Sequence, residues 1–287
     1  IVHEAAGHAP ILADPAYSEY LQMYAAMAKK AIFSREDLKL YEAIRRLSDV
    51  KENPDCTAAE VEAASAGLAA ANAALSFVSE AAKVARMNWW TVEYGLIGSL
   101  QAPKIYGAGL LSSVGESQAC LSPKVKKIRL TSQCIETSYD ITEPQPQLFV
   151  AEDIAHLKAV LLEFESTLSY KRGGLYGVEQ GLAGATVTTT TLDSGVEISG
   201  VIAGFEPDDA KQLDIGFMRW QGPVQLAEGG RELPGQGISQ HPSGFSTPLG
   251  RAKTLSHKAL TKASDDELTA DRHSTRGAHY PNIDEWL

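Results

Sequence analysis

The sequence predicts a mainly α-helical core with short β-strands, followed by a C-terminal β-rich extension. Apolar residues recur at helical spacing through roughly the first hundred residues. From about residue 185, alternating β-branched residues predict strands instead. With 287 residues, the chain is long enough for more than one domain. We therefore expect a core domain at 1–170, a β-rich extension at 171–250 and a polar tail at 251–287.

Three helices are expected in the first part of the core. The first covers 14–31, where Asp14 and the proline that follows it form an N-cap and first-turn pair. A second helix is expected over 34–47. The sequence TAAE at 57–60 is a capping box, and it should begin a long alanine-rich helix that continues toward residue 82.

The second part of the core mixes a helical segment with short strands. A helix is expected over 79–98, with two glycines near its end. The segment 104–117 is rich in glycine and serine yet apolar, which favours a loop or short strands that line a cavity. Three short strands should follow, at 124–130, 139–142 and 147–150. A helix over 152–168 closes the domain.

The expected extension consists of strands. Residues 185–205 alternate in the manner of strands, and the sequence DSG at 193–195 indicates a hairpin turn. Residues 214–226 predict another strand, and a stretch rich in glycine and proline follows at 228–250.

Composition favours a small-molecule partner. Thirty-six acidic against 26 basic residues give a net charge of −10, which disfavours nucleic acid or an anionic membrane surface as the partner. No apolar run has the length of a membrane span, and the first residues lack the features of a signal peptide. We therefore expect a soluble, cytoplasmic protein. Its three cysteines lack C-x-x-C spacing, so they should be reduced, buried thiols.

The opening sequence IVHEAAGHAP contains two histidines, His3 and His8. Because they are five residues apart, an ideal α-helix would place them about 140° apart around its axis. This spacing departs from the H-E-x-x-H motif of zinc proteases. However, Gly7 and Pro10 should end the helix, leaving His3 in its last turn and His8 just outside, free to turn back. The alternative is a pair of hydrogen-bonded structural histidines.

A third candidate ligand is Glu93, which lies in the apolar, aromatic stretch NWWTVEYG. A carboxylate is costly to bury there unless it is paired or bound to metal. A buried salt bridge or a helix face turned to water would also explain it. Two histidines with one carboxylate is the ligand set of non-haem Fe(II) oxygenases. Zinc hydrolases use the same set, so the ligands alone leave the metal open.

Four ordered motifs carry a resemblance to a known family. HEAAGH, WWTVEYGLIG, KIYGAGLLSSVGE and QPQLFVAE resemble the catalytic domain of the tetrahydropterin-dependent aromatic amino acid hydroxylases. The similarity is strongest to the longer bacterial phenylalanine 4-hydroxylase-like proteins and covers roughly 1–170. Residues 171–250 show only a general similarity to the C-terminal extension of those bacterial forms. The resemblance implies an aromatic amino acid hydroxylase-like core.

The resemblance also implies roles for individual residues. The family's iron ligands fall on His3, His8 and Glu93. A pterin contact falls on Glu4, and the residues of the substrate pocket fall on Trp89, Gly109 and Ser112. Ser112 is also similar to the serine that hydrogen-bonds the first histidine ligand and so fixes its orientation. No catalytic residue beyond the metal ligands is implied. The structural alternatives are core packing for Trp89, a turn for Ser112 and a solvent-facing acid for Glu4.

The activity implied is ring hydroxylation of an aromatic amino acid by Fe(II), a tetrahydropterin (tetrahydrobiopterin-like) and molecular oxygen as co-substrate. Phenylalanine, converted to tyrosine, is the expected substrate. Tryptophan hydroxylases tend to have Phe at the position of Trp89. Tyrosine hydroxylases carry an acid where this chain has Ile141, although this residue does not exclude tryptophan.

The chain departs from the family in three places. The family's pterin-stacking segment and substrate-binding arginine lie upstream of the first ligand, so we expect an N-terminal part to be missing here. Asn88 stands where relatives have Tyr or His. About thirty extra residues separate the second expected helix from the Glu93 helix, and they predict an added helical hairpin.

Three other functions stay open at this point. They are a tryptophan hydroxylase of the same family, a non-catalytic ligand-binding homologue, and a zinc hydrolase with Glu4 as its general base. The sequence leaves open the activity without the missing segment, the role of 171–287 and the oligomeric state, including a homo-oligomer.

Overall fold

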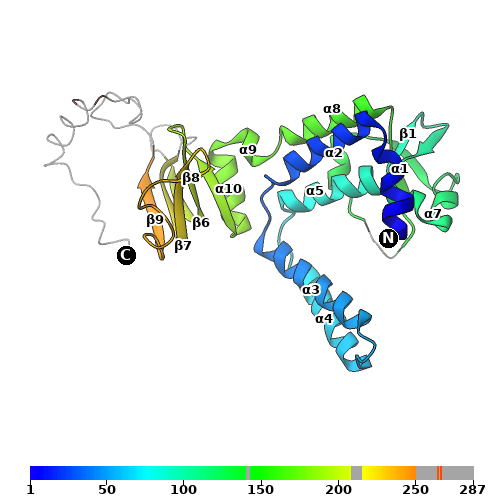
Figure 1. Cartoon of the computed structure of the whole chain (residues 1–287), viewed down its shortest axis with the longest axis horizontal. Helices are drawn as coiled ribbons and strands as arrows, with labels where there is room; N and C mark the ends of the chain where they lie inside the picture. Colours follow the sequence, from blue (N-terminus) through cyan, green and yellow to red (C-terminus); the bar gives the residue numbers. More distant parts are fainter. Residues whose placement is uncertain (140–142, 208–214, 250–263, 265, 267–287) are drawn as a thin grey trace. The chain divides into compact units, whose positions relative to one another are not determined.

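The structure, a computed structural model, describes residues 1–139, 143–207 and 215–249 with the single residues 264 and 266 (Figure 1). The chain divides into two compact units, Ile1–Gly184 and Ala185–Leu287. The tail expected at 251–287 and most of the strand expected at 139–142 lie outside the described residues.

The first unit begins with three short helical elements. A π-helical turn, η1 (Glu4–His8), runs directly into α1 (Ala9–Leu12), and α2 (Pro15–Ala28) follows. The Asp14 carboxylate caps α2 by accepting the backbone N–H groups of two residues in its first turn. The predicted helix and its N-cap are confirmed.

Helices α3 (Arg35–Glu52) and α4 (Ala58–Ala73) lie side by side as a hairpin (Figure 1). Helix α3 is the helix expected over 34–47, so the residues added after it supply the second helix of this hairpin and do not form a hairpin of their own. Each begins with a complete capping box. However, α4 ends at Ala73 and does not continue toward residue 82. Ser79 accepts a backbone N–H and begins a separate helix, α5 (Glu80–Asn88). The new N-cap explains why one long helix was the wrong prediction.

A buried carboxylate connects α5 with two distant segments. Glu80 is 3% exposed, and one of its oxygens accepts hydrogen bonds from the backbone N–H and the hydroxyl of Ser169, both at 2.6 Å. Its other oxygen accepts the Ile32 N–H at 3.1 Å. These bonds satisfy a charge that would otherwise be costly to bury.

A small mixed sheet supports the site. Its strands are β1 (Leu96–Gly98), β2 (Pro103–Ile105), β3 (Lys126–Arg129) and β4 (Gln147–Ala151), in the order β2-β1-β4-β3. Strand β1 pairs antiparallel with β2 and parallel with β4, and β3 is parallel to β4. The helix expected over 79–98 is therefore wrong in its last residues, which form β1.

Two short helices occupy part of the segment expected as a loop or short strands. They are α6 (Ala108–Leu111) and α7 (Val114–Ala119), separated by Ser112 and Ser113. Ser113 caps α7 by accepting the backbone N–H of Glu116. The glycines and serines of this segment begin and end short helices, which the composition alone did not show.

The first unit closes with a 3₁₀ turn and three helices: η3 (Ser132–Glu136), α8 (Ile154–Glu165), α9 (Ser169–Arg172) and α10 (Gly174–Gly184). Its core gathers buried side chains from α2, α5, the sheet and α8, including Tyr20, Met87, Trp90, Leu148 and Phe164. No described residue of the α3–α4 hairpin belongs to this core.

The second unit contains an antiparallel sheet. Its strands are β5 (Val187–Thr191), β6 (Val196–Pro207), β7 (Ile215–Glu228), β8 (Arg231–Glu232) and β9 (Gly244–Pro248). The order is β5-β6-β7-β8, and β9 also pairs with β7. Gly195 has φ +90° in the turn predicted by the sequence DSG. Strands begin only at Val187, so α9 and α10 occupy residues that we expected to belong to the β-rich extension.

Two further expectations concern the thiols and membranes. Cys120 and Cys134 are buried and Cys56 is partly buried, all three as free thiols. Burial raises the pKa of Cys134 to about 12, so this thiol stays protonated at neutral pH. Among the described helices, none has both the length and the apolar composition needed to cross a membrane.

Candidate metal centre

A π-helical turn places the two opening histidines on one face. In η1 the Ala9 N–H donates to the carbonyl of Glu4, five residues earlier. This bonding adds one residue to each turn relative to an α-helix, so side chains five apart come into line. The imidazoles of His3 and His8 meet edge to face, with ring centroids 4.9 Å apart.

The expected helix end at Gly7 and Pro10 is wrong. The chain stays helical through both residues, and Pro10 lies in the first turn of α1, where its missing N–H is tolerated. Gly7 is buried, and a Cβ on it would lie 2.6 Å from the backbone oxygen of Ala108. Gly7 therefore permits close packing rather than ending the helix, and π-type bonding explains how the histidines converge.

Glu93 lies on a second π-helical turn, η2 (Trp89–Glu93), which continues α5. The Tyr94 N–H donates to the carbonyl of Trp89 at 2.8 Å, again five residues back. The turn ends at Glu93, and β1 begins three residues later at Leu96. Both segments that carry candidate ligands therefore depart from α-helical geometry at those residues.

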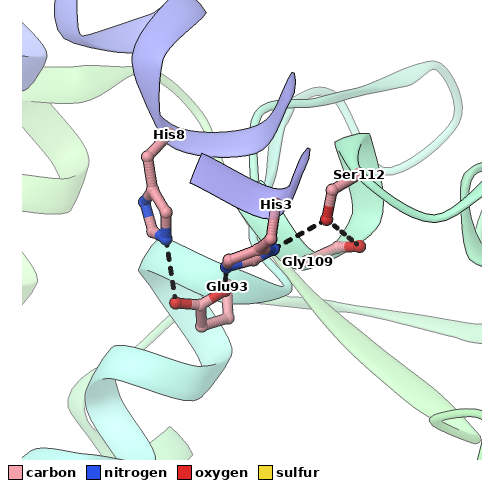
Figure 2. A network of polar contacts seen from close by, with 5 residues as sticks. All are labelled: His3, His8, Glu93, Gly109 and Ser112. Atoms are coloured by element: carbon pink, nitrogen blue, oxygen red, sulfur yellow. Dashed lines mark hydrogen bonds and ion pairs between the residues drawn. The ribbon is translucent and has the colours of Figure 1, made fainter. Parts of the chain in front are cut away.

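The three side chains converge on one point between the two turns (Figure 2). His3 Nε2 lies 3.5 Å from Glu93 Oε2, and His8 Nε2 lies 3.3 Å from Glu93 Oε1. One carboxylate thus presents one oxygen to each imidazole. The side chain of His3 is 44% exposed, and those of His8 and Glu93 are 21% and 19% exposed. The cluster is therefore open to solvent on the His3 side.

These distances fit donors that share a metal ion. Two donor atoms about 2.1 Å from one ion, at about 90–110° to each other, lie about 3.0–3.4 Å apart. The distances of 3.3 and 3.5 Å from the imidazoles to the carboxylate are close to this range. They exceed the usual hydrogen-bond length of about 2.7–3.2 Å. Imidazole and carboxylate donors suit iron or zinc, so the residues fit the expected metal.

A second carboxylate lies nearby. One ligand atom each of His3, Glu4 and His8 lie within 4.8 Å of one another. Glu4 and His8 also border an open depression of about 440 Å³, whose other lining residues are Ile1, Ala5, Ala9 and Leu12. Glu93 is the better third ligand because it faces both imidazoles at once, whereas Glu4 is exposed on the same turn as the histidines.

Ser112 forms a hydrogen bond with the first histidine, His3. Its hydroxyl lies 2.8 Å from His3 Nδ1 and has the carbonyl of Gly109 as a second partner at 3.4 Å (Figure 2). When the hydroxyl donates to that carbonyl, it accepts the proton of His3 Nδ1. This arrangement leaves the lone pair of His3 Nε2 directed at Glu93. The structure therefore brings Ser112 and Gly109 into the histidine cluster.

Trp89 lies in an aromatic stack. Its ring is 4.4 Å from the ring of Tyr94 and 4.3 Å from the ring of Tyr139, with interplanar angles of 23° and 8°. Both faces of the indole are covered. Its Nε1 is buried and has no hydrogen-bond partner among the described residues. Any contact of Trp89 with a ligand would therefore use the edge of the indole.

Tyr17, a buried residue of α2, is a neighbour of the cluster that no sequence motif indicates. Burial raises the pKa of Tyr17 to about 12, and the charge of Glu93 contributes to the increase. The phenol is therefore neutral at physiological pH. Helical periodicity marks such a residue as buried but gives no sign that a carboxylate from another helix lies near it.

Comparison with known proteins identifies the domain. Residues 59–179 match the profile of the biopterin-dependent aromatic amino acid hydroxylases. This segment is similar to part of an aromatic amino acid hydroxylase domain. It contains Trp89, Glu93, Gly109 and Ser112, whereas the histidine turn precedes the matched range.

Relatives of the hydroxylase domain include animal and bacterial proteins. The phenylalanine-4-hydroxylase of Homo sapiens is 43% identical over 88 residues, which cover 30% of this chain and 19% of the human protein. That of Caulobacter vibrioides is 26% identical over 208 residues, 71% of this chain and 56% of the relative. A solved phenylalanine hydroxylase from Legionella pneumophila is 25% identical, covers 60% of this chain and 52% of that chain, and has a TM-score of 0.39. The chain thus spans about a fifth of its human relative.

Proposed function

We propose that this chain contributes the iron site of a tetrahydropterin-dependent monooxygenase that converts L-phenylalanine to L-tyrosine. The observation that carries the proposal is the convergence of His3, His8 and Glu93 in a chain with a hydroxylase domain. The first unit would be the catalytic core and the second an extension to it, and a cytoplasmic location belongs to the same proposal.

The chain's own residues would hold the metal on one side and leave the other side open. The two imidazoles and the Glu93 carboxylate supply three donors, and Ser112 fixes the orientation of His3. A six-coordinate ion held in this way keeps positions for further ligands on the exposed side. Bound Fe(II), with oxygen and a reduced pterin that supplies two electrons, would provide the hydroxylating chemistry.

Two other residues have proposed contacts in this site. Glu4 borders the open depression beside His8, and we assign it the pterin contact. A volume of about 440 Å³ lies within the usual range of about 300–1,000 Å³ for small-molecule sites. Trp89 would meet the substrate ring through the edge of its indole, because its faces are stacked on tyrosines. Gly109 would line the same pocket.

Phenylalanine is the proposed substrate for two reasons. The relatives found in Homo sapiens and Caulobacter vibrioides are phenylalanine-4-hydroxylases. Trp89 also places a large side chain where tryptophan hydroxylases tend to have a smaller ring. Ile141, which argues against tyrosine, lies outside the described residues.

The proposal is tested in two steps on the 287-residue chain. The first is an anaerobic Fe(II) titration of the wild type and of the variants Glu93→Gln and Glu4→Gln. We expect the wild type and Glu4→Gln to bind one iron, and Glu93→Gln to lose binding. Equal affinity in the wild type and Glu93→Gln, or loss of affinity only in Glu4→Gln, would contradict the ligand assignment.

The second step adds oxygen, tetrahydropterin and either phenylalanine or tryptophan to the iron-loaded chain, and identifies the product by chromatography. Tyrosine from phenylalanine is expected. Hydroxylated tryptophan alone would favour the alternative substrate. Iron binding without any product would favour a ligand-binding homologue for this chain, and co-purified zinc with hydrolytic activity would favour the hydrolase.

A further inference from the structure

The short helix α6 and its flanking residues pack against both turns that carry candidate ligands, although they supply no ligand themselves. Its first residue, Ala108, packs on Gly7, which lies between the two histidines. The preceding residue, Gly107, packs on the backbone of Glu93. Ser112, at the end of the helix, holds His3. The segment Gly107–Ser112, called here the α6 segment, therefore lies between the histidine turn and the glutamate turn.

The packing distances leave no room for a methyl group at the two closest glycines. A Cβ on Gly7 would lie 2.6 Å from the backbone oxygen of Ala108 and 3.0 Å from its Cβ. A Cβ on Gly107 would lie 2.4 Å from the backbone oxygen of Glu93 and 2.5 Å from the backbone nitrogen of Gly95. In both cases the nearest atom belongs to the backbone, so no side-chain rotation can relieve the contact.

Glycine is needed at these two positions because of the lack of space and not because of the backbone conformation. Gly7 lies within the helical turn η1, and Gly107 has φ −61° and ψ 131°, which any residue adopts. Neither glycine is among the described residues with positive φ. Alanine would therefore suit both backbones and would be excluded only by the segment packed against them.

We propose that Gly7 and Gly107 are positioning residues, whose missing side chains let the α6 segment set the separation between the histidine turn and the glutamate turn. This inference rests on the proposed iron site. Metal–ligand distances are held to about ±0.2 Å, and a site that is about 0.5 Å too loose loses its function. A methyl group at Gly7 would push the histidines away from Glu93 by a few tenths of an ångström. The ligands would then no longer reach one ion together.

The chain offers a graded series of alanine substitutions at glycines in or next to helices. A Cβ on Gly115, in α7, would meet nothing within 4 Å, so Gly115→Ala is the matched control. A Cβ on Gly109 would lie 2.9 Å from the Tyr94 ring and 3.1 Å from the backbone oxygen of Glu93, which is a milder contact than at Gly7. The four variants therefore rank as Gly115→Ala, Gly109→Ala, Gly7→Ala and Gly107→Ala in increasing severity.

The test measures Co(II) affinity and the Co(II) absorption spectrum of each full-length variant, together with circular dichroism and the thermal midpoint of the metal-free chain. We expect Gly115→Ala to match the wild type. Gly7→Ala should bind Co(II) roughly 10- to 100-fold more weakly, with an altered spectrum and wild-type helical content. Gly109→Ala should fall between them.

Each outcome supports or overturns the inference. A wild type that does not bind Co(II) would contradict the proposed iron site itself. A wild type that binds, with Gly7→Ala binding equally well, would overturn the positioning role alone. A purely structural role predicts a lower metal-free thermal midpoint with unchanged Co(II) affinity. If Gly7→Ala fails to fold, the comparison of Gly109→Ala with Gly115→Ala decides, and equal affinity in those two variants would overturn the inference.

Discussion

Ser112 is a residue that supplies no candidate ligand but hydrogen-bonds one, His3. Its hydroxyl is 2.8 Å from His3 Nδ1, so it determines which nitrogen of the imidazole faces Glu93. Because the His3 side chain is 44% exposed, little else restrains it on the solvent side. The orientation of the most exposed candidate ligand therefore depends on this hydrogen bond.

We predict that Ser112→Ala lowers Fe(II) affinity by roughly 10- to 100-fold, because the orientation of His3 is no longer fixed. Anaerobic titration measures this effect. Ser117→Ala is the control, since Ser117 is a partly exposed residue of α7 whose hydroxyl donates to the Val114 carbonyl in the same helix. Equal affinity in Ser112→Ala and the control would show that the hydrogen bond does not position His3.

Among the secondary-structure elements, the α3–α4 hairpin has a carboxylate, that of Glu36, which joins the start of α3 to the residues after α4. The two oxygens of Glu36 accept the backbone N–H and the hydroxyl of Ser76, each at 2.7 Å. These bonds, the backbone one most of all, hold the pKa of Glu36 below its ordinary value. The contact closes the open end of the hairpin opposite the turn between the two helices.

We predict that the hairpin loses stability in acid. A carboxyl whose pKa is lowered by folding contributes stability above its unfolded pKa, and the contribution disappears as pH falls through the folded pKa. The protection of amide hydrogens in α3 and α4, after correction for the pH dependence of intrinsic exchange, should therefore fall below about pH 4.3 relative to neutral pH. Glu36→Gln should remove much of this pH dependence.

The control for this prediction is Glu62→Gln, on the exposed side of α4, which should keep the acid response of the wild type. If Glu36→Gln and wild type respond to acid identically, the contact with Ser76 does not close the hairpin.

The elements that sequence reasoning predicted best are those with local start signals. The aspartate cap of α2 and the capping boxes of α3 and α4 act within four residues, so the sequence shows them directly. The end of α4 and the short helices α6 and α7 lie in stretches of small residues, and they were missed. Strand β1 was missed because its apolar residues also continue the helical pattern of α5.

The sequence pointed to the residues of the candidate site but did not show how they are arranged. On an ideal α-helix His3 and His8 would point in different directions. We expected the helix to end at Gly7 and so let His8 turn back, but the chain stays helical there. Gly7, within the π-type turn, packs against Ala108, which is far away in the sequence, and a local pattern cannot show such a contact. The roles of Glu4, Trp89 and Gly109 rest on the family resemblance, and these roles stay predictions.

At the scale of the whole molecule, all the candidate metal, pterin and substrate residues lie in the first unit. The unit ends at Gly184, and the strands of the second unit begin at Val187. The core that supports the metal site likewise draws all its side chains from the first unit. Within the described residues, the candidate ligands and the core that supports them therefore all precede the second unit.

We predict that a chain ending at Gly184 binds Fe(II) with the affinity of the full chain, within about threefold. Circular dichroism should show that its helices are retained, and anaerobic titration measures the affinity. A folded truncated chain that loses iron binding would show that residues after 184 take part in the site.

The central claim is that His3, His8 and Glu93 hold one iron between two π-helical turns. Anomalous diffraction at the iron absorption edge, from crystals of the chain loaded with Fe(II), tests it most directly. The account predicts one iron peak within about 2.0–2.3 Å of His3 Nε2, His8 Nε2 and an oxygen of Glu93. A peak ligated by Glu4 in place of Glu93, or the absence of iron between the two turns, would contradict it.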